Sequence, residues 1–284
     1  MNHSILVTGA TGIIGREVVA QLKAADIPFD VLSAREFATP DSAIRRGDFD
    51  DTASLTAAFS GVHTLFVLLP LAPGKVQRAR NVAAAAKAAG VQHIVRSSGL
   101  VLDTAAPYSL PRLQREIDEI LASTGIACTF LRNATYMQNY LSFKAPMVRA
   151  GIVYGATANA PESLIDARDI AQVAAIILND PKPHAGQAYV LTGAEALTDT
   201  ERMAQLSQVL GREVVFQSIP PEAAAAAMRD DWKLPVELVD WLDSLNRLVS
   251  AGLAASVSDD VKRLTGRAPR SFAQFARDNA ARWA

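Results

Sequence analysis

The N-terminal segment constrains the fold of this chain more than any other part. A short apolar stretch, residues 4–8, runs directly into a turn with three evenly spaced glycines, Gly9, Gly12 and Gly15. Glycine permits a tight turn and lets the backbone approach a pyrophosphate closely. A helix beginning near Ile13 would direct its unbonded N–H groups and the positive end of its dipole at the same point. This order of elements predicts a dinucleotide site, although a tight turn without ligand is the alternative. The expected cofactor contacts in the turn are Gly9, Thr11, Gly12, Ile13, Ile14 and Gly15.

Strands and helices alternate through the first half of the chain, which is typical of a doubly wound parallel sheet. After the first strand we expect strands at 29–33, 43–46, 64–69, 91–97 and 126–131, and helices at 16–25, 52–59, 75–89 and 112–123. Beyond residue 135 the pattern loosens, with short strands at 152–154, 188–191 and 214–219, helices at 167–178 and 199–210, and only helices and loops from 220 onward. The sequence therefore predicts an α/β fold, a Rossmann-type doubly wound parallel sheet with a smaller mixed α/β C-terminal lobe. We expect residues 1–134 plus parts of 164–192 to form the NADP(H)-binding domain, and 135–163 and 193–284 the interwoven substrate-binding lobe.

Composition excludes several classes of protein. The net charge of −1 and the scattered basic residues argue against a nucleic-acid partner. The single cysteine, Cys128, excludes an internal disulfide and lies in an apolar run, and no Cys/His cluster has the spacing of a metal site. Neither a signal peptide nor a membrane span is evident. We therefore expect a cytoplasmic protein with a small-molecule substrate, no metal and no membrane partner, and leave open whether it is a monomer or a homodimer.

The end of the second predicted strand bears on the choice between NAD and NADP. An acidic residue at this point would bond the ribose hydroxyls of NAD. Arg35 stands there instead, and a guanidinium fork matches the 2′-phosphate of NADP. We therefore expect NADP(H), with NAD(H) less favoured. Glu36 follows directly, and a solvated loop arginine is the alternative.

A second group of candidate cofactor contacts follows the short third strand. Asp48 is placed to accept a hydrogen bond from the adenine amino group, with Phe49 beside the ring. The alternative is an N-cap for the helix at 52–59, to which Asp50 or Asp51 would contribute. Both interpretations can hold at once for different residues.

Two further strand ends should lie at the cofactor, because ligands bind beyond the carboxyl ends of parallel strands. Leu69 and Pro70 end the fourth predicted strand, and the segment that they begin should pass over the cofactor. The hydroxyls of Ser97 and Ser98, at the end of the fifth, should face the nicotinamide.

Five segments together resemble the NmrA-like family, atypical members of the short-chain dehydrogenase/reductase superfamily. They are VTGATGIIG (7–15), RRGDFDDTASLTAAFSGVHTLFVLLP (45–70), ARNVAAAAKAAGVQHIVRSSGL (79–100), STGIACTFLRNATYMQNYL (123–141) and LIDARDIAQVAA (164–175). The fourth is most similar to bacterial NADPH-dependent quinone, azo-dye and triphenylmethane-dye reductases. The resemblance implies that such a protein binds NADP(H) in the nucleotide domain and holds substrate between that domain and the smaller lobe.

The same resemblance implies the residues of a substrate pocket. Asn133, Tyr136 and Asn139 would line or support it, and residues 165–169 would lie near its wall. For Asp166, Arg168 and Asp169 we favour a structural interpretation, a helix N-terminus with a surface ion pair.

The chain departs from typical short-chain dehydrogenases at their Tyr-x-x-x-Lys pair. Tyr108 and Arg112 have the spacing, but an arginine cannot replace lysine in a proton relay, and we expect Pro111 to interrupt the helix. The family's lysine position falls near residues 114–116, where no lysine is present.

We therefore expect a reductase in which positioning an acceptor over the nicotinamide does most of the work. The acceptor would be quinone-like or otherwise conjugated. Tyr136 or Asn133 would donate a hydrogen bond to the charge that develops on it. The alternative is a non-catalytic NADP(H)-binding sensor that acts through a protein partner.

Overall fold

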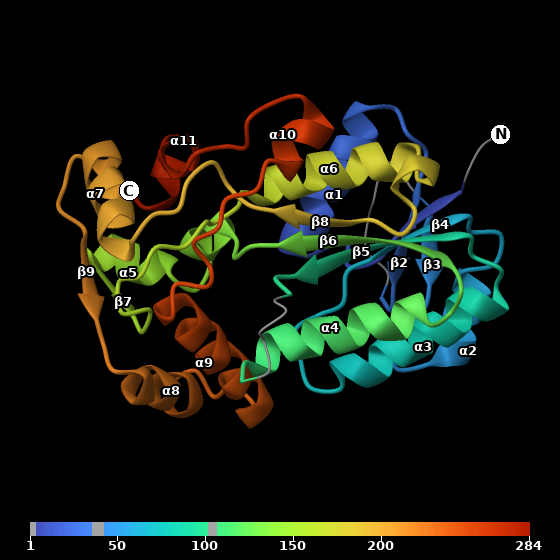
Figure 1. Cartoon of the computed structure of the whole chain (residues 1–284), viewed down its shortest axis with the longest axis horizontal. Coiled ribbons are helices and arrows are strands. Elements are labelled where there is room, and N and C mark those ends of the chain that lie inside the picture. The colour runs from blue at the N-terminus through green and yellow to red at the C-terminus, as the bar shows by residue number, and fades with distance from the viewer. Residues whose placement is uncertain (1–3, 36–42, 102–106) are drawn as a thin grey trace. The chain divides into compact units, whose positions relative to one another are not determined.

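The computed structural model describes residues 4–35, 43–101 and 107–284 (Figure 1). The chain divides into two compact units, each built from three stretches of sequence. Unit 1 comprises residues 1–101, 113–132 and 170–190, and unit 2 comprises 102–112, 133–169 and 191–284.

A seven-stranded sheet forms the centre of unit 1 within the described residues. In spatial order its strands are β3 (Ile44–Arg46), β2 (Asp30–Ser33), β1 (Ile5–Val7), β4 (Thr64–Val67), β5 (His93–Gly99), β6 (Ala127–Asn133) and β8 (Ala188–Leu191). The last residue of each of the strands β6 and β8 belongs to unit 2. The pairs from β3 to β5 are parallel. Strands β1 and β4 are buried along their whole length, as expected where helices cover both faces. The strand order reverses between β1 and β4, and ligands of open α/β sheets bind at such a point.

Helices cover both faces of this sheet. Figure 1 shows α2 (Thr52–Ala58), α3 (Lys75–Ala88) and α4 (Ser109–Ala122) on one face, and α1 (Ile13–Ala24) and α6 (Ala167–Asn179) on the other. Asp51 caps α2, and α3 is followed by Gly90 in the left-handed conformation, φ 73°. A short 3₁₀ turn, η2 (Lys182–His184), precedes β8.

Unit 2 has its own aromatic core. It contains η1 (Met137–Leu141), α5 (Ala145–Ala150), β7 (Ile152–Gly155), α7 (Asp199–Leu210), β9 (Val215–Ser218), α8 (Pro221–Asp230), α9 (Val236–Ser250), α10 (Asp260–Thr265), α11 (Phe272–Asn279) and η3 (Ala280–Arg282). Strands β7 and β9 form a separate parallel pair. Tyr140 meets Phe272 edge-on with ring centroids 5.2 Å apart, and the Trp283 indole N–H donates to the Tyr140 carbonyl at 2.7 Å. Residues more than a hundred positions apart in the sequence therefore pack together in one core.

The predicted fold class is confirmed, and most predicted elements lie within two or three residues of the observed ones. The expectation that Pro111 interrupts its helix is wrong, because α4 begins at Ser109 and Pro111 lies in its first turn. Backbone N–H groups there have no partner within the helix, so proline removes no helical hydrogen bond. Cys128 is buried, in agreement with the apolar run in which it lies, and burial raises the pKa of its thiol to about 11.

Two absences hold for the described residues. No described helix is long and apolar enough to cross a membrane. No cluster of His, Cys, Asp and Glu in the described part of the chain could hold a metal ion.

Candidate functional site

The glycine turn joins β1 to α1 with no room for larger residues at two positions. Gly9 adopts φ 67°, and a Cβ on it would lie 2.9 Å from the Leu68 carbonyl oxygen. A Cβ on Gly15 would overlap the Gly9 carbonyl and lie 2.8 Å from the Cα of Ala10. The Gly12 N–H donates to the Gly9 carbonyl at 2.9 Å, which closes the turn. Only glycine permits this close packing of turn and helix.

The N-terminus of α1 fits a phosphate group. Gly12 is its N-cap residue, no side chain caps the helix, and its first turn contains no acidic residue. Ile14 is buried in the core, so only its backbone can meet a ligand, while Thr11 is exposed and Ile13 half-buried. Unbonded N–H groups at a helix N-terminus attract phosphate through direct hydrogen bonds and the helix dipole. The turn therefore offers a backbone cradle for a pyrophosphate.

Arg35 follows β2 at the edge of the sheet where the glycine turn follows β1. Its backbone N–H donates to the Ser33 hydroxyl at 3.1 Å, and that hydroxyl donates to the Arg35 carbonyl at 2.6 Å. These bonds fix the turn, and the Arg35 side chain is exposed. Glu36, the residue that complicated the choice of cofactor, lies outside the described residues.

The carboxylates of the acidic loop after β3 have different hydrogen-bond partners. Asp51 accepts from the N–H groups of Ala53 and Ser54 at 2.9 and 3.3 Å, which confirms an N-cap at this point. Asp50 accepts two bonds of 2.9 Å from the Arg78 guanidinium, which lowers the pKa of this carboxyl. Asp48 is exposed, and its Oδ1 accepts from the Asp50 N–H at 3.0 Å.

The loops beside this cluster are tied to neighbouring elements. The Asn81 amide donates to the Phe49 carbonyl at 2.8 Å, so the Phe49 backbone is anchored to α3. The Leu68 N–H donates to the Thr8 hydroxyl at 2.9 Å, which joins the ends of β4 and β1. The following Leu69 is buried and Pro70 is exposed. The segment that begins at Leu69 therefore leaves the sheet at the point where the strand order reverses.

Ser97 and Ser98 both lie buried within β5. The Ser98 hydroxyl accepts from Arg96 at 3.0 Å and donates to Asp118 at 3.1 Å. The Arg96 guanidinium also donates to the Gln114 carbonyl at 2.9 Å and to the Gln114 side-chain oxygen at 2.6 Å, and it is ion-paired with Asp118. Ser98 thus belongs to a buried network that joins β5 to α4. Sequence reasoning missed this network, since an arginine in a central strand gives no local sign of its partners.

Asn133 and Tyr136 lie at the start of the second stretch of unit 2. Asn133 is buried, and Tyr136 is half-buried immediately before η1. Tyr136 forms a bridge with Ile165, the Met137 N–H donates to the Ile165 carbonyl at 2.9 Å, and the Asn139 N–H donates to the Tyr136 carbonyl at 3.1 Å. The structure therefore brings the segment of Tyr136 beside residues 165–169.

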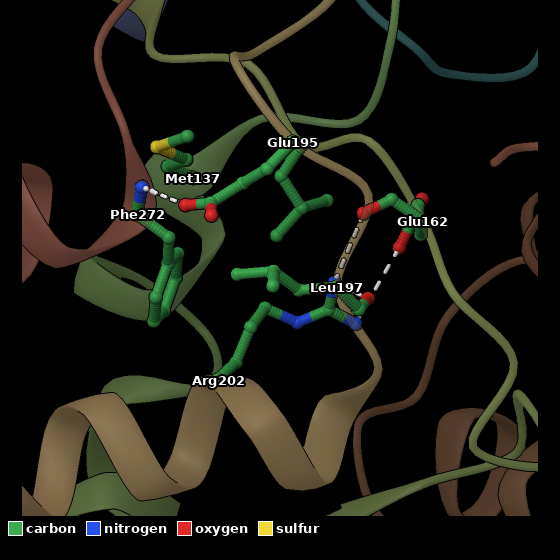
Figure 2. A pocket seen from close by; sticks show the side chains of 7 residues that line it. Met137, Glu162, Glu195, Leu197, Arg202 and Phe272 are labelled. Atoms are coloured by element: carbon green, nitrogen blue, oxygen red, sulfur yellow. Dashed lines mark hydrogen bonds and ion pairs between the residues drawn. The ribbon is translucent and has the colours of Figure 1, made fainter. Parts of the chain in front are cut away.

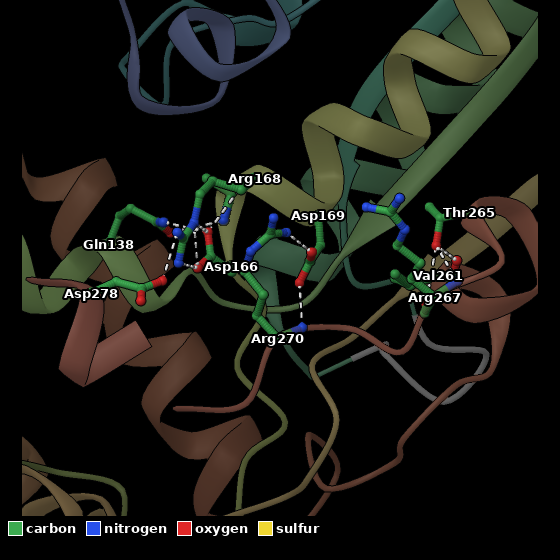
Figure 3. A network of polar contacts seen from close by, with 10 residues as sticks. Gln138, Asp166, Arg168, Asp169, Val261, Thr265, Arg267, Arg270 and Asp278 are labelled. Atoms are coloured by element: carbon green, nitrogen blue, oxygen red, sulfur yellow. Dashed lines mark hydrogen bonds and ion pairs between the residues drawn. The ribbon is translucent and has the colours of Figure 1, made fainter. Parts of the chain in front are cut away.

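The charged residues at the start of α6 form a buried network (Figure 3). Asp166 is fully buried and accepts from Arg168 at 2.6 Å and from the Gln138 amide at 2.8 Å. Arg168 also reaches Asp278 at 2.8 Å, and the buried Asp169 pairs with Arg270. The predicted ion pair is present between Arg168 and Asp166, but its predicted surface location is wrong, because the C-terminal segment supplies further partners and the carboxylates of Asp166 and Asp169 are buried. The helix start itself lies where it was predicted.

The pocket in Figure 2 is a small cavity in unit 2 with a volume of about 10 Å³, about enough for one water molecule. It is lined by Met137, Glu162, Leu164, Glu195, Leu197, Arg202 and Phe272. Arg202 is bonded to Asp199 at 2.8 Å and to the Leu197 carbonyl at 2.7 Å, and Glu195 accepts from the Phe272 N–H at 3.3 Å. This volume is below the range of pockets that hold drug-sized ligands, roughly 300–1,000 Å³. Its polar groups stabilise the lobe and leave no room for a conjugated acceptor.

The fold and the glycine turn define a Rossmann-type α/β protein with a site for a dinucleotide. The sequence matches the NmrA-like family over residues 1–274, and the chain belongs to this family. It is 38% identical to NAD(P)H azoreductase of Xenophilus azovorans over 98% of both chains. It is 37% identical to (4-alkanoyl-5-oxo-2,5-dihydrofuran-3-yl)methyl phosphate reductase of Streptomyces griseus, over 97% of this chain and 98% of the relative. Among solved structures, the NADPH complex of an Escherichia coli NADPH-dependent quinone oxidoreductase is 31% identical, with a TM-score of 0.86 and coverage of 96% of this chain and 98% of that chain. The predicted resemblance is thus confirmed.

Proposed function

We propose that the chain is an NADPH-dependent reductase that transfers hydride to a quinone-like, azo or other conjugated acceptor. The observation that carries this proposal is the uncapped N-terminus of α1 behind a glycine turn that admits no side chain at Gly15. Relatives that match almost the whole chain support it, because they are reductases by name, and one related structure contains NADPH.

We assign the cofactor contacts from the geometry of unit 1. The pyrophosphate would lie on the turn formed by Gly9, Thr11, Gly12, Ile13, Ile14 and Gly15. Arg35 would pair with the 2′-phosphate, which favours NADP(H) over NAD(H), and Asp48 with Phe49 would hold the adenine. The rest of the cofactor would be bordered by Leu69, Pro70, Ser97 and Ser98. The Ser98 hydroxyl would contribute through the network that it forms with Arg96. Residues 1–134 with parts of 164–192 would form this domain, and 135–163 with 193–284 the substrate-binding lobe.

The bound cofactor supplies the hydride. The protein positions the acceptor and stabilises the charge that develops on it. A quinone or azo acceptor that receives a hydride develops negative charge on oxygen or nitrogen. Tyr136 and Asn133 carry hydrogen-bond donors that we assign to this charge. We further propose a cytoplasmic protein that acts on a small molecule as a monomer or homodimer.

The test is direct. Purified protein is mixed with NADPH and a panel of quinones and azo compounds, and the loss of NADPH absorbance is followed. We expect turnover with at least one acceptor, weaker use of NADH, and a loss of kcat of about a hundredfold for Y136F or N133A, at the low end of the range for a lost transition-state donor. Binding of NADPH without turnover on any acceptor would contradict a reductase and favour the sensor. Unchanged kcat in both variants would remove Tyr136 and Asn133 from the reaction while leaving the reductase intact.

A further inference from the structure

Helices α7 and α11 of unit 2 pack against each other and leave a groove between them (Figure 1). Met203 and Leu206 of α7 and Phe275 and Ala276 of α11 are buried in the aromatic core. The groove has a volume of about 320 Å³, at the lower end of the range for pockets that hold small ligands, roughly 300–1,000 Å³. Its lining consists of Gln205, Gln208, Val209, Ala273 and Arg277.

The spacing of these residues explains the groove. Gln205, Gln208 and Val209 stand at positions i, i+3 and i+4 and therefore share one face of α7. Ala273 and Arg277 stand at positions i and i+4 and share one face of α11. Because the side chain of Ala273 is small, the space between the two faces stays open. A longer side chain at this position would fill it.

Arg277 is the single charged residue of the lining. Its side chain is exposed, and among the described residues no hydrogen bond or ion pair joins it to a partner. The neighbouring Asp278 is bound by Arg168 instead, at 2.8 Å. A guanidinium presents parallel N–H groups that match the two oxygens of a carboxylate. One cation in the lining suits a ligand with a single negative charge.

Gln205 contributes a hydrogen-bond acceptor to the same groove. Its side-chain oxygen is buried, and within the described part of the chain no group donates a hydrogen bond to it. A buried acceptor without a donor is unfavourable, and few remain in folded proteins. The terminal torsion of a glutamine side chain is broad, so a turn of the amide presents this oxygen to the groove. An O–H or N–H group of a ligand would then supply the missing hydrogen bond.

Val209 and Ala273 supply the apolar part of the lining. Val209 is half-buried and packs against the aromatic core of unit 2. Neither side chain forms hydrogen bonds, so both favour contact with the hydrocarbon part of a ligand.

We propose that this groove binds a small monocarboxylate with an apolar body and a hydroxyl group at the far end from its carboxylate. The carboxylate pairs with Arg277, the hydroxyl donates to the Gln205 oxygen, and the body lies against Val209 and Ala273. The site is built from α7 and α11 alone, so this inference does not depend on the proposed reductase function.

Calorimetric titration with 4-hydroxybenzoate tests the assignment. Benzoate, which lacks the hydroxyl, and inorganic phosphate, which lacks the apolar body, are titrated for comparison. Saturating NADP⁺ is present throughout, so that the probes do not bind at the cofactor site.

Four variants accompany these titrations. R277Q removes the charge, Q205L removes the acceptor, and A273M fills the groove. R282Q is the matched control, because it removes an exposed arginine of η3 that does not line the groove. The Tm of each variant reports whether it is folded, and R277Q and Q205L keep the test valid if A273M does not fold.

We expect 4-hydroxybenzoate to bind wild type at one site and more tightly than benzoate or phosphate. R277Q and A273M should raise its Kd by about tenfold or more, and R282Q should leave its Kd within about twofold. Q205L should bind 4-hydroxybenzoate and benzoate equally. If 4-hydroxybenzoate does not bind wild type, or binds R277Q and A273M as tightly as wild type, the groove is not its site. If phosphate binds wild type as tightly as 4-hydroxybenzoate, the groove selects charge alone and the proposed class of ligand is wrong.

Discussion

Replacement of Gly15 by alanine tests the closeness of the glycine turn to α1. The new Cβ would overlap the Gly9 carbonyl and lie 2.7 Å from the Gly9 carbonyl carbon and 2.8 Å from the Ala10 Cα. All of these are backbone atoms, so no flexible side chain can move aside. Overpacking of this kind costs about 1–3 kcal/mol, while alanine returns up to about 1 kcal/mol as the better helix former. We expect a net destabilisation of about 1–2 kcal/mol.

Gly12 provides a matched control in the same turn. A Cβ at Gly12 would meet only the Gly9 carbonyl oxygen, at 3.3 Å, and Gly12 has φ −77°, which alanine adopts freely. The substitution G12A should therefore cost well under 1 kcal/mol, chiefly because alanine is a poorer N-cap than glycine.

Thermal unfolding and NADPH titration measure both effects. A loss of about 1–2 kcal/mol should lower Tm by about 2–6 °C for a chain of this size. The Kd for NADPH should rise at least tenfold in G15A, since displacement of α1 moves its N–H groups away from the phosphates, and tenfold corresponds to about 1.4 kcal/mol. Because Gly12 is itself assigned to the pyrophosphate, G12A is a control for stability alone, and its Tm should stay within about 3 °C of wild type. A G15A protein that unfolds and binds like wild type, or a G12A protein that is the less stable of the two, would refute the reasoning.

Four further substitutions separate cofactor choice from stability. In R35A the Kd for NADPH should rise about tenfold, while the Kd for NADH stays unchanged. The rise in Kd is modest because Arg35 is exposed. Equal losses of affinity for both cofactors in titrations would contradict a contact with the 2′-phosphate. In D51A two α2 N–H groups lose their acceptor, so unfolding should require about 1 kcal/mol less, whereas D48A should leave Tm nearly unchanged. Burial raises the pKa of Asp199, but Lys144 and Arg202 outweigh it and lower that pKa to about 2. The ionised Asp199 therefore stabilises the folded state fully above about pH 4, and this stabilisation is lost as the pH falls toward about 2. D199N should be less stable than wild type at neutral pH, and its unfolding curves should lack this acid transition.

The parts of the fold that sequence predicted well are those set by local physics. The glycine turn, the cap at Asp51 and the alternation of apolar strands with helices each depend on residues within one or two turns of chain. Pro111 was misjudged because its effect depends on the turn of α4 in which it lies.

Long-range pairing could not be predicted in the same way. The sequence around Asp169 indicates an exposed charge at a helix start, but Arg270, 101 residues later, pairs with it. The partners of Arg96 likewise lie on α4, at Gln114 and Asp118, which the sequence near β5 does not reveal. Local signals thus predicted the glycine turn, while the buried ion pairs appeared only in the assembled structure.

The bond between Trp283 and Tyr140 has a consequence for the order in which this chain folds. The two residues are 143 positions apart. At a synthesis rate of about 5–20 residues per second, roughly 7–29 s separate their appearance on the ribosome. During that interval the nascent chain presents Tyr140 without the aromatic residues that later enclose it. We therefore expect the Rossmann unit to begin to form during translation, and the lobe to remain an open, chaperone-accessible intermediate until the segment around Trp283 has been made.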